Sequence, residues 1–187
     1  VTSKSVTDQS RWPTLQGPHN AQNIAAATAA CNALGIDPEA IERGLETYPG
    51  LPHRMERVRE RNGVLYVNDS KATNATATAP ALAAYPAIHW ILGGQAKTNE
   101  LDACALHYEN VRAAYTIGEA GPMFAKLLTG HMPVAECEIL TEAVNRAAAA
   151  ALAGDTVLLS PACASFDQFR DYEARGDACR AAVEALA

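Results

Sequence analysis

No stretch of this sequence is apolar over the length that a membrane-spanning helix needs. The longest apolar-looking run, residues 24–34, contains Thr28 and Asn32 and is far too short to cross a bilayer. The N-terminus also lacks the charged, apolar and cleavable parts of a signal peptide. We therefore expect a protein of the cytoplasm, with no membrane as a partner.

Positive charge is also scarce. The 15 Lys+Arg stand against 21 Asp+Glu, which gives a formal net charge of -6, and no basic cluster of five or more residues occurs. A surface that binds nucleic acid has to neutralise many phosphates. The charge balance therefore argues against nucleic acid as a partner.

Cysteines at disulfide or metal-ligand spacing are missing as well. The five cysteines are an odd number and widely spaced, with no C-x-x-C pair and no nearby histidine at zinc-ligand spacing. We expect small buried thiols rather than a disulfide framework or a metal site. These cysteines are Cys31, Cys104, Cys137, Cys163 and Cys179.

The 187 residues, 49 % of them hydrophobic, suffice for a core of ordinary size. An Ala-rich run over residues 19–34 predicts a helix that stops before Gly35. Asp37 as N-cap and Pro38 at the first helical position predict a second helix. The length favours one domain plus an appendage, and these two helices form the appendage.

The segment Pro49-Gly50-Leu51-Pro52 is the best linker candidate in the chain. We place a domain boundary near residue 50, so that residues 1–50 and residues 51–187 form two parts. Because the chain begins with Val1 rather than Met, we also expect it to belong to a longer protein.

Beyond this boundary, short apolar runs alternate with segments of helical composition. Such an order predicts parallel strands with right-handed crossovers, and hence an α/β sheet flanked by helices. The expected strands are residues 64–67, 88–92, 113–117, 135–139 and 156–159. The expected helices are residues 76–84, 100–108, 119–128, 142–152 (capped by Thr141) and 165–186.

Four turns follow strands, at the edge of the sheet where open α/β folds bind ligands. They are residues 68–74, 93–100, 118–122 and 160–169. In the first turn, Asp69 suits a ribose hydroxyl or a hydrated Mg²⁺, Lys71 a phosphate or carboxylate, and Thr73 offers a hydroxyl at a helix start. The alternative is an ordinary helix-capping turn with a solvated lysine.

The second turn, GGQAKTNE, does not match the G-x-x-x-x-G-K-[ST] spacing of a phosphate loop. Its glycines still allow close approach of a ligand, and Lys97 suits an anion; a flexible turn is the alternative. In the last turn we expect Ser165 at the start of the following helix. There its hydroxyl and the free N–H groups would bind a carboxylate or phosphate, unless it is simply an N-cap.

Two further positions carry candidate binding groups. Arg54, just after the linker, suits bidentate contact with phosphate or a surface ion pair. Asn20 and Asn23, three residues apart, share a helix face; they suit an adenine edge or helix capping.

Taken in order, GPHNAQN, GLPHRME, VNDSKATN, GGQAKT, LLSPACASFDQF and FRDYEARGD resemble the Mur ligase family over residues 17 to about 180. SPACASFDQF resembles the members that add D-glutamate. The resemblance implies an ATP-dependent amide ligase of peptidoglycan synthesis. Its members phosphorylate the carboxylate of a UDP-muramoyl substrate, here UDP-N-acetylmuramoyl-L-alanine, and the amine of D-glutamate attacks the acyl phosphate.

The resemblance also assigns roles to residues that contact ATP. It places Asn20 and Asn23 at the adenine, Arg54 at a phosphate and Asp69 at the ribose. Lys71 would stabilise the charge that develops on the transferring phosphoryl group, as a catalytic residue.

For D-glutamate, the resemblance implies two separate anion sites. Thr73 and Lys97 resemble the α-carboxylate site, and Ser165 with the backbone N–H of Tyr172 resembles the γ-carboxylate site. The chain departs from the family at Gln95, where GGRAK or GGDGK is common.

Family members have three domains, and the resemblance implies that residues 51–187 are the Rossmann-like C-terminal one. Residues 1–50 would be the tail of the central ATPase domain. The phosphate loop, most Mg²⁺ ligands and the UDP-binding domain would lie elsewhere in the same protein, so we expect a monomeric enzyme of which this chain alone is inactive. Another Mur or folylpolyglutamate-type ligase, or a stand-alone binding module, remains the alternative.

Overall fold

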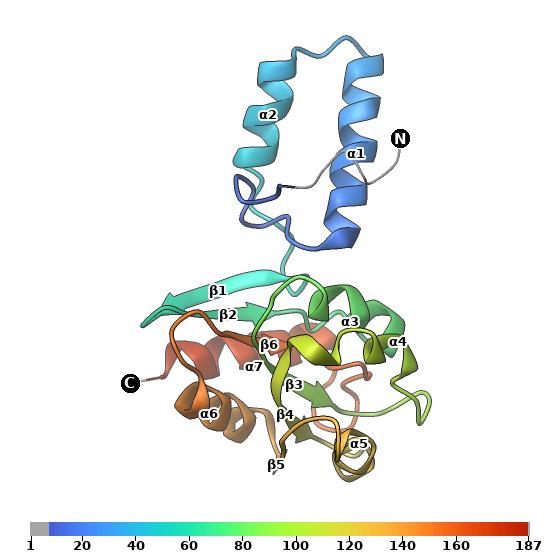
Figure 1. Cartoon of the computed structure of the whole chain (residues 1–187), viewed down its shortest axis with the longest axis vertical. Helices are drawn as coiled ribbons and strands as arrows, with labels where there is room; N and C mark the ends of the chain where they lie inside the picture. The colour runs from blue at the N-terminus through green and yellow to red at the C-terminus, as the bar shows by residue number, and fades with distance from the viewer. Residues whose placement is uncertain (1–7, 187) are drawn as a thin grey trace. The chain divides into compact units, whose positions relative to one another are not determined.

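The computed structural model describes residues 8–186 and divides the chain into two compact units, with the boundary in the sequence between Leu51 and Pro52 (Figure 1). Within the described residues, no helix is both long enough and apolar enough to cross a membrane.

The first unit contains the two expected helices, α1 (Pro18–Ala33) and α2 (Pro38–Glu46). The Asp37 carboxylate accepts a hydrogen bond of 3.0 Å from the Glu39 N–H, as predicted for an N-cap. On α1, the buried residues Ala21, Ile24 and Ala25 form an apolar stripe at helical spacing.

The second unit is built on a six-stranded sheet with the order β1-β2-β6-β3-β4-β5. Four neighbouring pairs are parallel, and only β1 and β2 are antiparallel. The strands are β1 (Glu56–Arg61), β2 (Val64–Asn68), β3 (Ile88–Gly93), β4 (Val111–Ile117), β5 (Val134–Glu138) and β6 (Thr156–Leu159). The predicted α/β fold with a mostly parallel sheet is confirmed.

Strand β1 was not predicted, because its sequence ERVRER is almost entirely charged and lies at the sheet edge. Charged residues on an edge strand prevent pairing with another chain. Asn62 and Gly63, with φ of 52° and 74°, turn the chain from β1 into β2. An Asn-Gly pair with positive φ is the signature of a two-residue hairpin, so this dipeptide was the available signal.

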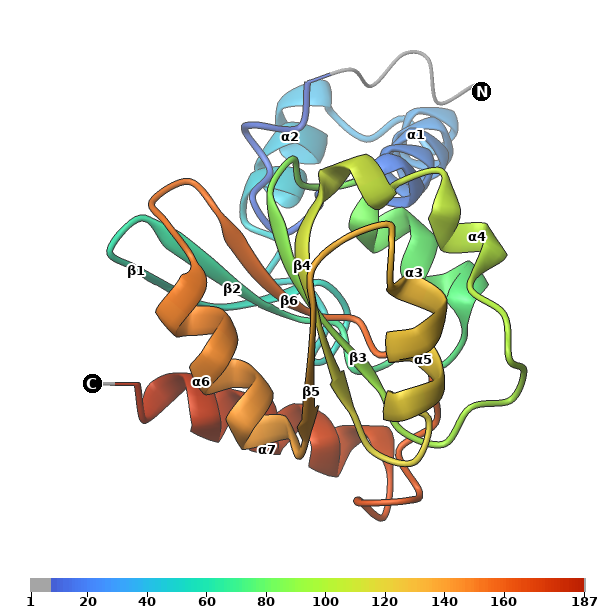
Figure 2. The same ribbon diagram turned by 60° about the horizontal axis from the view of Figure 1, so that its bottom comes forward.

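Helices cover both faces of the sheet (Figure 2). One face packs against α3 (Ala75–Leu82), α4 (Asp102–Ala105) and α5 (Gly121–Leu128). The other packs against α6 (Leu140–Ala150) and α7 (Tyr172–Glu184). Strand β3 is buried along its whole length, because Trp90 enters the first core and Ile91 the second.

Three helix predictions were wrong in their bounds or caps. The expected helix 100–108 forms only α4 and a short 3-10 helix, η2 (Tyr108–Asn110). Helix α6 begins after Ile139 without a side-chain cap, so Thr141 is not its N-cap. Helix α7 begins seven residues later than expected, after Asp171, whose carboxylate accepts a bond of 2.7 Å from the Ala174 N–H.

The predicted burial of the cysteines holds for four of them. Cys104, Cys137, Cys163 and Cys179 are buried, whereas Cys31 on α1 is partly exposed. The pKa of Cys179 is raised to about 12 by burial, which makes its thiol inert.

Candidate functional site

All four predicted turns lie at the carboxyl edge of the sheet. Three of them follow β2, β6 and β3, which are neighbours in the strand order. The fourth follows β4 and joins them through Ala120, whose N–H donates to the Gly94 carbonyl oxygen at 2.9 Å. Gln95 and Ala164 form an isolated antiparallel bridge between two of these turns, with N–H···O distances of 2.9 and 3.0 Å. Residues 68–74, 93–97 and 160–165 therefore form one loop cluster.

Asp69 follows β2 directly and is buried in this cluster, 7 % exposed. Its carboxylate accepts hydrogen bonds from the Ser160 hydroxyl at 2.8 Å and from the Met55 N–H at 3.2 Å. Burial raises the pKa of Asp69 to about 7, and these two hydrogen bonds together with the charge of Arg54 only partly oppose it. At neutral pH, the protonated and the charged form of the Asp69 carboxyl group are therefore present in similar amounts.

Lys71 and Tyr172 lie together although they are far apart in the sequence. The Lys71 ammonium nitrogen is 3.7 Å from the centroid of the Tyr172 ring, a cation–π contact. Tyr172 is the first residue of α7. The turn that carries Lys71 is thereby held against the start of that helix.

His53 forms the back of this region, a role that sequence reasoning missed. It is buried, has φ of 61°, and its ring stands edge-on to that of Tyr172 with centroids 6.0 Å apart. The amide nitrogen of Asn68 lies 3.1 Å from His53 Nδ1 and donates to Glu56 at 3.0 Å. A Cβ at Gly176 would lie 2.1 Å from His53 Nδ1, so α7 needs glycine there to approach this ring.

Thr73 lies immediately before α3 and is half-buried. The residue that caps α3 is Asn74, whose side chain accepts a hydrogen bond of 2.9 Å from the Ala77 N–H. The capping role in this turn is therefore taken by Asn74, which leaves the Thr73 hydroxyl to another use. Lys97 is exposed on the turn after β3.

Ser165 is buried, 2 % exposed, but it does not begin the last helix as predicted. It lies in the loop between β6 and α7, where its carbonyl oxygen accepts a hydrogen bond of 2.8 Å from the Phe169 N–H. The tight turn that this bond closes delays the helix until Tyr172. The N–H of Tyr172, at the first helical position, has no partner within the helix and belongs to the positive end of its dipole.

Arg175 is the second residue that sequence reasoning missed, although the motif FRDYEARGD contains it. Its side chain is 1 % exposed. Its guanidinium donates to the Ser70 hydroxyl at 3.0 Å and to the carbonyl oxygens of Ser70 at 2.9 Å, Cys163 at 3.0 Å and Ala164 at 3.2 Å. The helix-compatible spacing of the motif gave no sign that this residue faces inward.

The remaining candidates lie elsewhere. Arg54 is exposed, one residue from His53. Asn20 and Asn23 belong to the first unit, where Asn23 donates a hydrogen bond of 3.2 Å to the side-chain oxygen of Asn20. The two amides therefore share a face of α1, as their spacing predicted.

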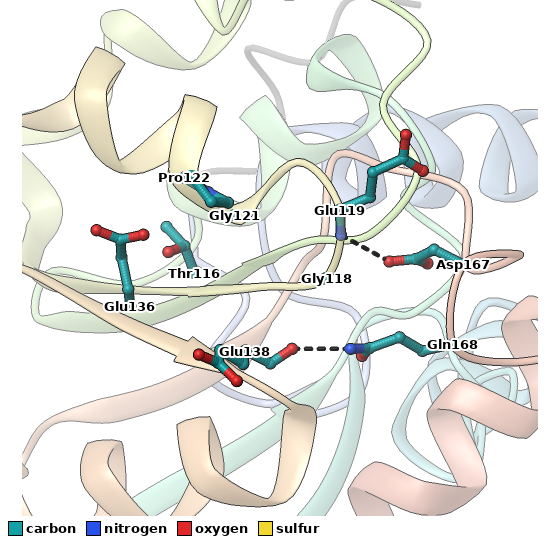
Figure 3. A pocket seen from close by; sticks show the side chains of 9 residues that line it. All are labelled: Thr116, Gly118, Glu119, Gly121, Pro122, Glu136, Glu138, Asp167 and Gln168. Carbon is teal, nitrogen blue, oxygen red and sulfur yellow. Dashed lines mark hydrogen bonds between the residues drawn. The ribbon is translucent and has the colours of Figure 1, made fainter.

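A hollow of about 380 Å³ lies beside the loop cluster, at the carboxyl ends of β4 and β5 (Figure 3). Four carboxylate side chains line it: Glu119, Glu136, Glu138 and Asp167. Asp167 accepts a hydrogen bond of 2.9 Å from the Glu119 N–H, which fixes one wall. Such a lining repels an anionic ligand, so this hollow is unsuited to a dicarboxylate or a nucleotide.

The sequence that forms most of this region matches a known protein family. The family model described as Mur ligase, glutamate ligase domain, matches residues 53–163. The chain belongs to the Mur ligase family. The match lies within the second unit and includes the turns after β2 and β3.

Similar Mur ligases extend the match to both units. A protein from Novosphingobium aromaticivorans named UDP-N-acetylmuramoylalanine--D-glutamate ligase is 59 % identical over 186 residues, which cover 100 % of this chain and 42 % of that protein. A protein of the same name from Zymomonas mobilis is 58 % identical, with 97 % and 42 % covered. This chain thus spans about two fifths of the length of these relatives.

Solved structures share the fold at low sequence identity. UDP-N-acetylmuramate-alanine ligase from Thermotoga maritima has a TM-score of 0.63 and 14 % identity, covering 90 % of this chain and 38 % of that one. The folylpolyglutamate synthase/dihydrofolate synthase from Yersinia pestis, solved with AMPPNP and a manganese ion, has a TM-score of 0.57 and 18 % identity, covering 90 % and 40 %. At such identities the likeness establishes the fold alone.

Proposed function

We propose that the protein containing this Mur ligase chain joins D-glutamate to UDP-N-acetylmuramoyl-L-alanine in the cytoplasm, with ATP as the phosphoryl donor. The observation that carries the proposal is the 58–59 % identity, over essentially the whole chain, to relatives named for this reaction. At this identity the loop cluster and its chemistry are expected to be shared. The two solved ligases of other specificity described above share the fold at only 14 % and 18 % identity.

The loop cluster supports binding of an amino acid with two carboxylates. Thr73 and Lys97, from the turns after β2 and β3, supply a hydroxyl and a cation for the α-carboxylate. Ser165 and the backbone N–H of Tyr172 supply donors for the γ-carboxylate near the positive end of α7. Two anion sites on separate elements bind a dicarboxylate in one orientation, with its amine held toward the reacting carboxyl group.

Lys71 is suited to electrostatic catalysis. Bound ATP supplies the phosphoryl group that activates the muramoyl carboxylate. The Tyr172 ring holds the Lys71 ammonium by its face, 3.7 Å away, and leaves its positive charge unneutralised. That charge then stabilises negative charge on the transferring phosphoryl group and raises kcat.

We assign the contacts to the other parts of the nucleotide to four further residues of this chain. Asp69 accepts from a ribose hydroxyl, Arg54 contacts a phosphate, and Asn20 and Asn23 contact the adenine edge. Within residues 8–186, no group of three or more His, Cys, Asp or Glu side chains is arranged to hold a metal ion. We propose that the Mg²⁺ ligands lie in the rest of the protein.

The proposal is tested with the full-length protein by measuring phosphate release from ATP with UDP-N-acetylmuramoyl-L-alanine and one amino acid at a time. We expect turnover with D-glutamate and none with D-alanine, L-lysine or meso-diaminopimelate. Turnover with one of the other three and not with D-glutamate would refute the substrate assignment. Thr73→Ala should raise the KM for D-glutamate far more than the KM for ATP, since only the α-carboxylate site loses a donor.

A further inference from the structure

Arg175 joins two parts of the loop cluster through a single buried side chain. Its three guanidinium nitrogens donate to Ser70, next to Lys71, and to Cys163 and Ala164, next to Ser165. Arg175 itself lies three residues after Tyr172 on α7. One rigid, planar group therefore contacts both turns that flank the proposed substrate, from the helix that supplies a third contact.

Among the described residues, Arg175 forms no ion pair with a carboxylate, although the charge of Asp167 is near enough to raise its pKa. Arg180, on the same helix, does form such pairs, with Glu56 at 2.7 Å and with Asp177. Burial lowers the pKa of Arg175 to about 10, so the side chain stays charged at neutral pH. A buried cation without an ion pair, near the positive end of a helix, is costly for the fold.

A fold that needed only to fill this space would be served better by an apolar side chain. Apart from the Ser70 hydroxyl, the acceptors of Arg175 are main-chain carbonyl oxygens, so its contacts mainly fix the position of the backbone. Close packing supports the same arrangement, because a Cβ at Gly94 would lie 2.3 Å from the Ala164 carbonyl oxygen and 3.1 Å from Arg175 Nη1. The turn that leads to Lys97 is thus held against the same carbonyl group.

We propose that Arg175 is a positioning residue for the amino-acid substrate: it fixes the separation of the two carboxylate sites by tying the Lys71–Thr73 turn and the Ser165 loop to α7. Its uncompensated charge adds a positive potential that favours a dianionic amino acid. The inference rests on the proposed D-glutamate site. Arg175 acts through other residues and does not itself contact substrate.

The test compares variants of the full-length protein. Arg175→Lys keeps the charge, but a single ammonium group cannot reach both turns; Arg175→Met removes charge and contacts together. Ser70→Ala removes the hydroxyl that accepts from Arg175 and donates to the Tyr172 carbonyl oxygen at 2.8 Å, and it leaves the buried charge in place. Val183→Ala, a buried apolar truncation on the same helix, is the matched control for destabilisation.

We expect Arg175→Lys to raise the KM for D-glutamate at least tenfold and the KM for ATP less than threefold. Ser70→Ala should raise the KM for D-glutamate in the same direction by a smaller factor. Val183→Ala should lower Tm with an unchanged KM for D-glutamate. Hydrogen exchange of Arg175→Lys should speed up at the amides of residues 68–74 and 160–165 and stay unchanged in β3 and β4.

Two results would overturn the inference. One is a KM for D-glutamate and a loop exchange rate within twofold of wild type in both Arg175→Lys and Ser70→Ala. The other is an increase in this KM for Val183→Ala that matches the increase for Arg175→Lys, which would show general destabilisation. If the wild-type protein does not use D-glutamate, the proposed function fails separately, and loop exchange still decides whether Arg175 holds the two turns.

Discussion

At the scale of single residues, burial decides the chemistry of the loop cluster more than residue type does. Asp69 is a carboxyl group whose pKa is raised to about 7 because it is buried, although two hydrogen bonds favour its charged form. Arg175 stays charged in the same interior because carbonyl oxygens surround it. At neutral pH, Asp69 is therefore near its titration point, whereas Arg175 keeps its positive charge.

The raised pKa of Asp69 predicts how stability depends on pH. The folded protein binds this proton more tightly than the unfolded chain, whose pKa is near 3.8. The stabilisation that this bound proton contributes is therefore complete below pH 3.8 and is lost as the pH rises toward 7. We expect the free energy of unfolding to fall by about 2 kcal/mol more in wild type than in Asp69→Asn between pH 5 and 8.

This difference is measured by urea unfolding of the 187-residue chain at several pH values. The other titrating groups are common to both proteins, so the comparison isolates Asp69. Parallel pH profiles of stability for wild type and Asp69→Asn would show that burial does not raise the pKa of this carboxyl group.

At the scale of elements, helix α7 combines a late start with a glycine near its first turn. Asp171, rather than Ser165, caps the helix, so Tyr172 and Arg175 lie in its first turns and face the loop cluster. Gly176 follows, where the helix passes closest to the ring of His53. The position of this helix thus depends on one cap and one missing side chain.

Gly176→Ala should destabilise the protein although alanine is the better helix former. Alanine normally gains about 1 kcal/mol over glycine inside a helix. Here its Cβ would lie 2.1 Å from the Nδ1 atom of a buried histidine, and such overpacking costs about 1–3 kcal/mol. We expect a net decrease in the free energy of unfolding, measured with denaturant.

Gly44→Ala on α2 is the matched control. A Cβ there has no atom within 4 Å, so only the helix propensity changes. Slower amide exchange in α2 of Gly44→Ala is the expected result. If Gly176→Ala stabilises α7 to the same extent, the close approach to His53 is not rigid.

At the scale of the whole molecule, the chain covers 42 % of the length of its relatives. In the proposed function, the loop cluster binds the amino acid and makes only some of the contacts to the nucleotide. Among the described residues, no group of three or more His, Cys, Asp or Glu side chains is placed to hold a metal ion. The proposed function assigns the remaining contacts to the rest of the protein.

The 187-residue chain by itself should bind D-glutamate weakly and hydrolyse no ATP. In the proposed function, part of the contacts to the amino acid comes from the rest of the protein, so the chain alone should recover less of the entropy cost of binding. Isothermal titration calorimetry at millimolar D-glutamate measures this affinity. A submicromolar Kd would show that the loop cluster is a complete site without the remaining domains.

Local sequence signals determined much of the fold. Five apolar runs, each ending in a polar or glycine-bearing turn, gave the parallel strands, and Asp37 gave the start of α2. The motifs indicated the family, which the match over residues 53–163 confirms. Periodicity and turn chemistry act over a few residues, so they can be read without knowing what packs against what.

Only the tertiary structure decided which side chains face the loop cluster. The sequence predicted Ser165 at the start of the last helix, whereas the backbone turn closed by Phe169 delays the helix and Asp171 caps it. Arg175 looks like a surface residue of a helix until the carbonyl oxygens of residues 70, 163 and 164 surround it. The contact of Arg175 with Ser70 joins residues 105 positions apart, and that of Ser160 with Asp69 joins residues 91 positions apart. The desolvation that raises the pKa of Asp69 exists only once such contacts form.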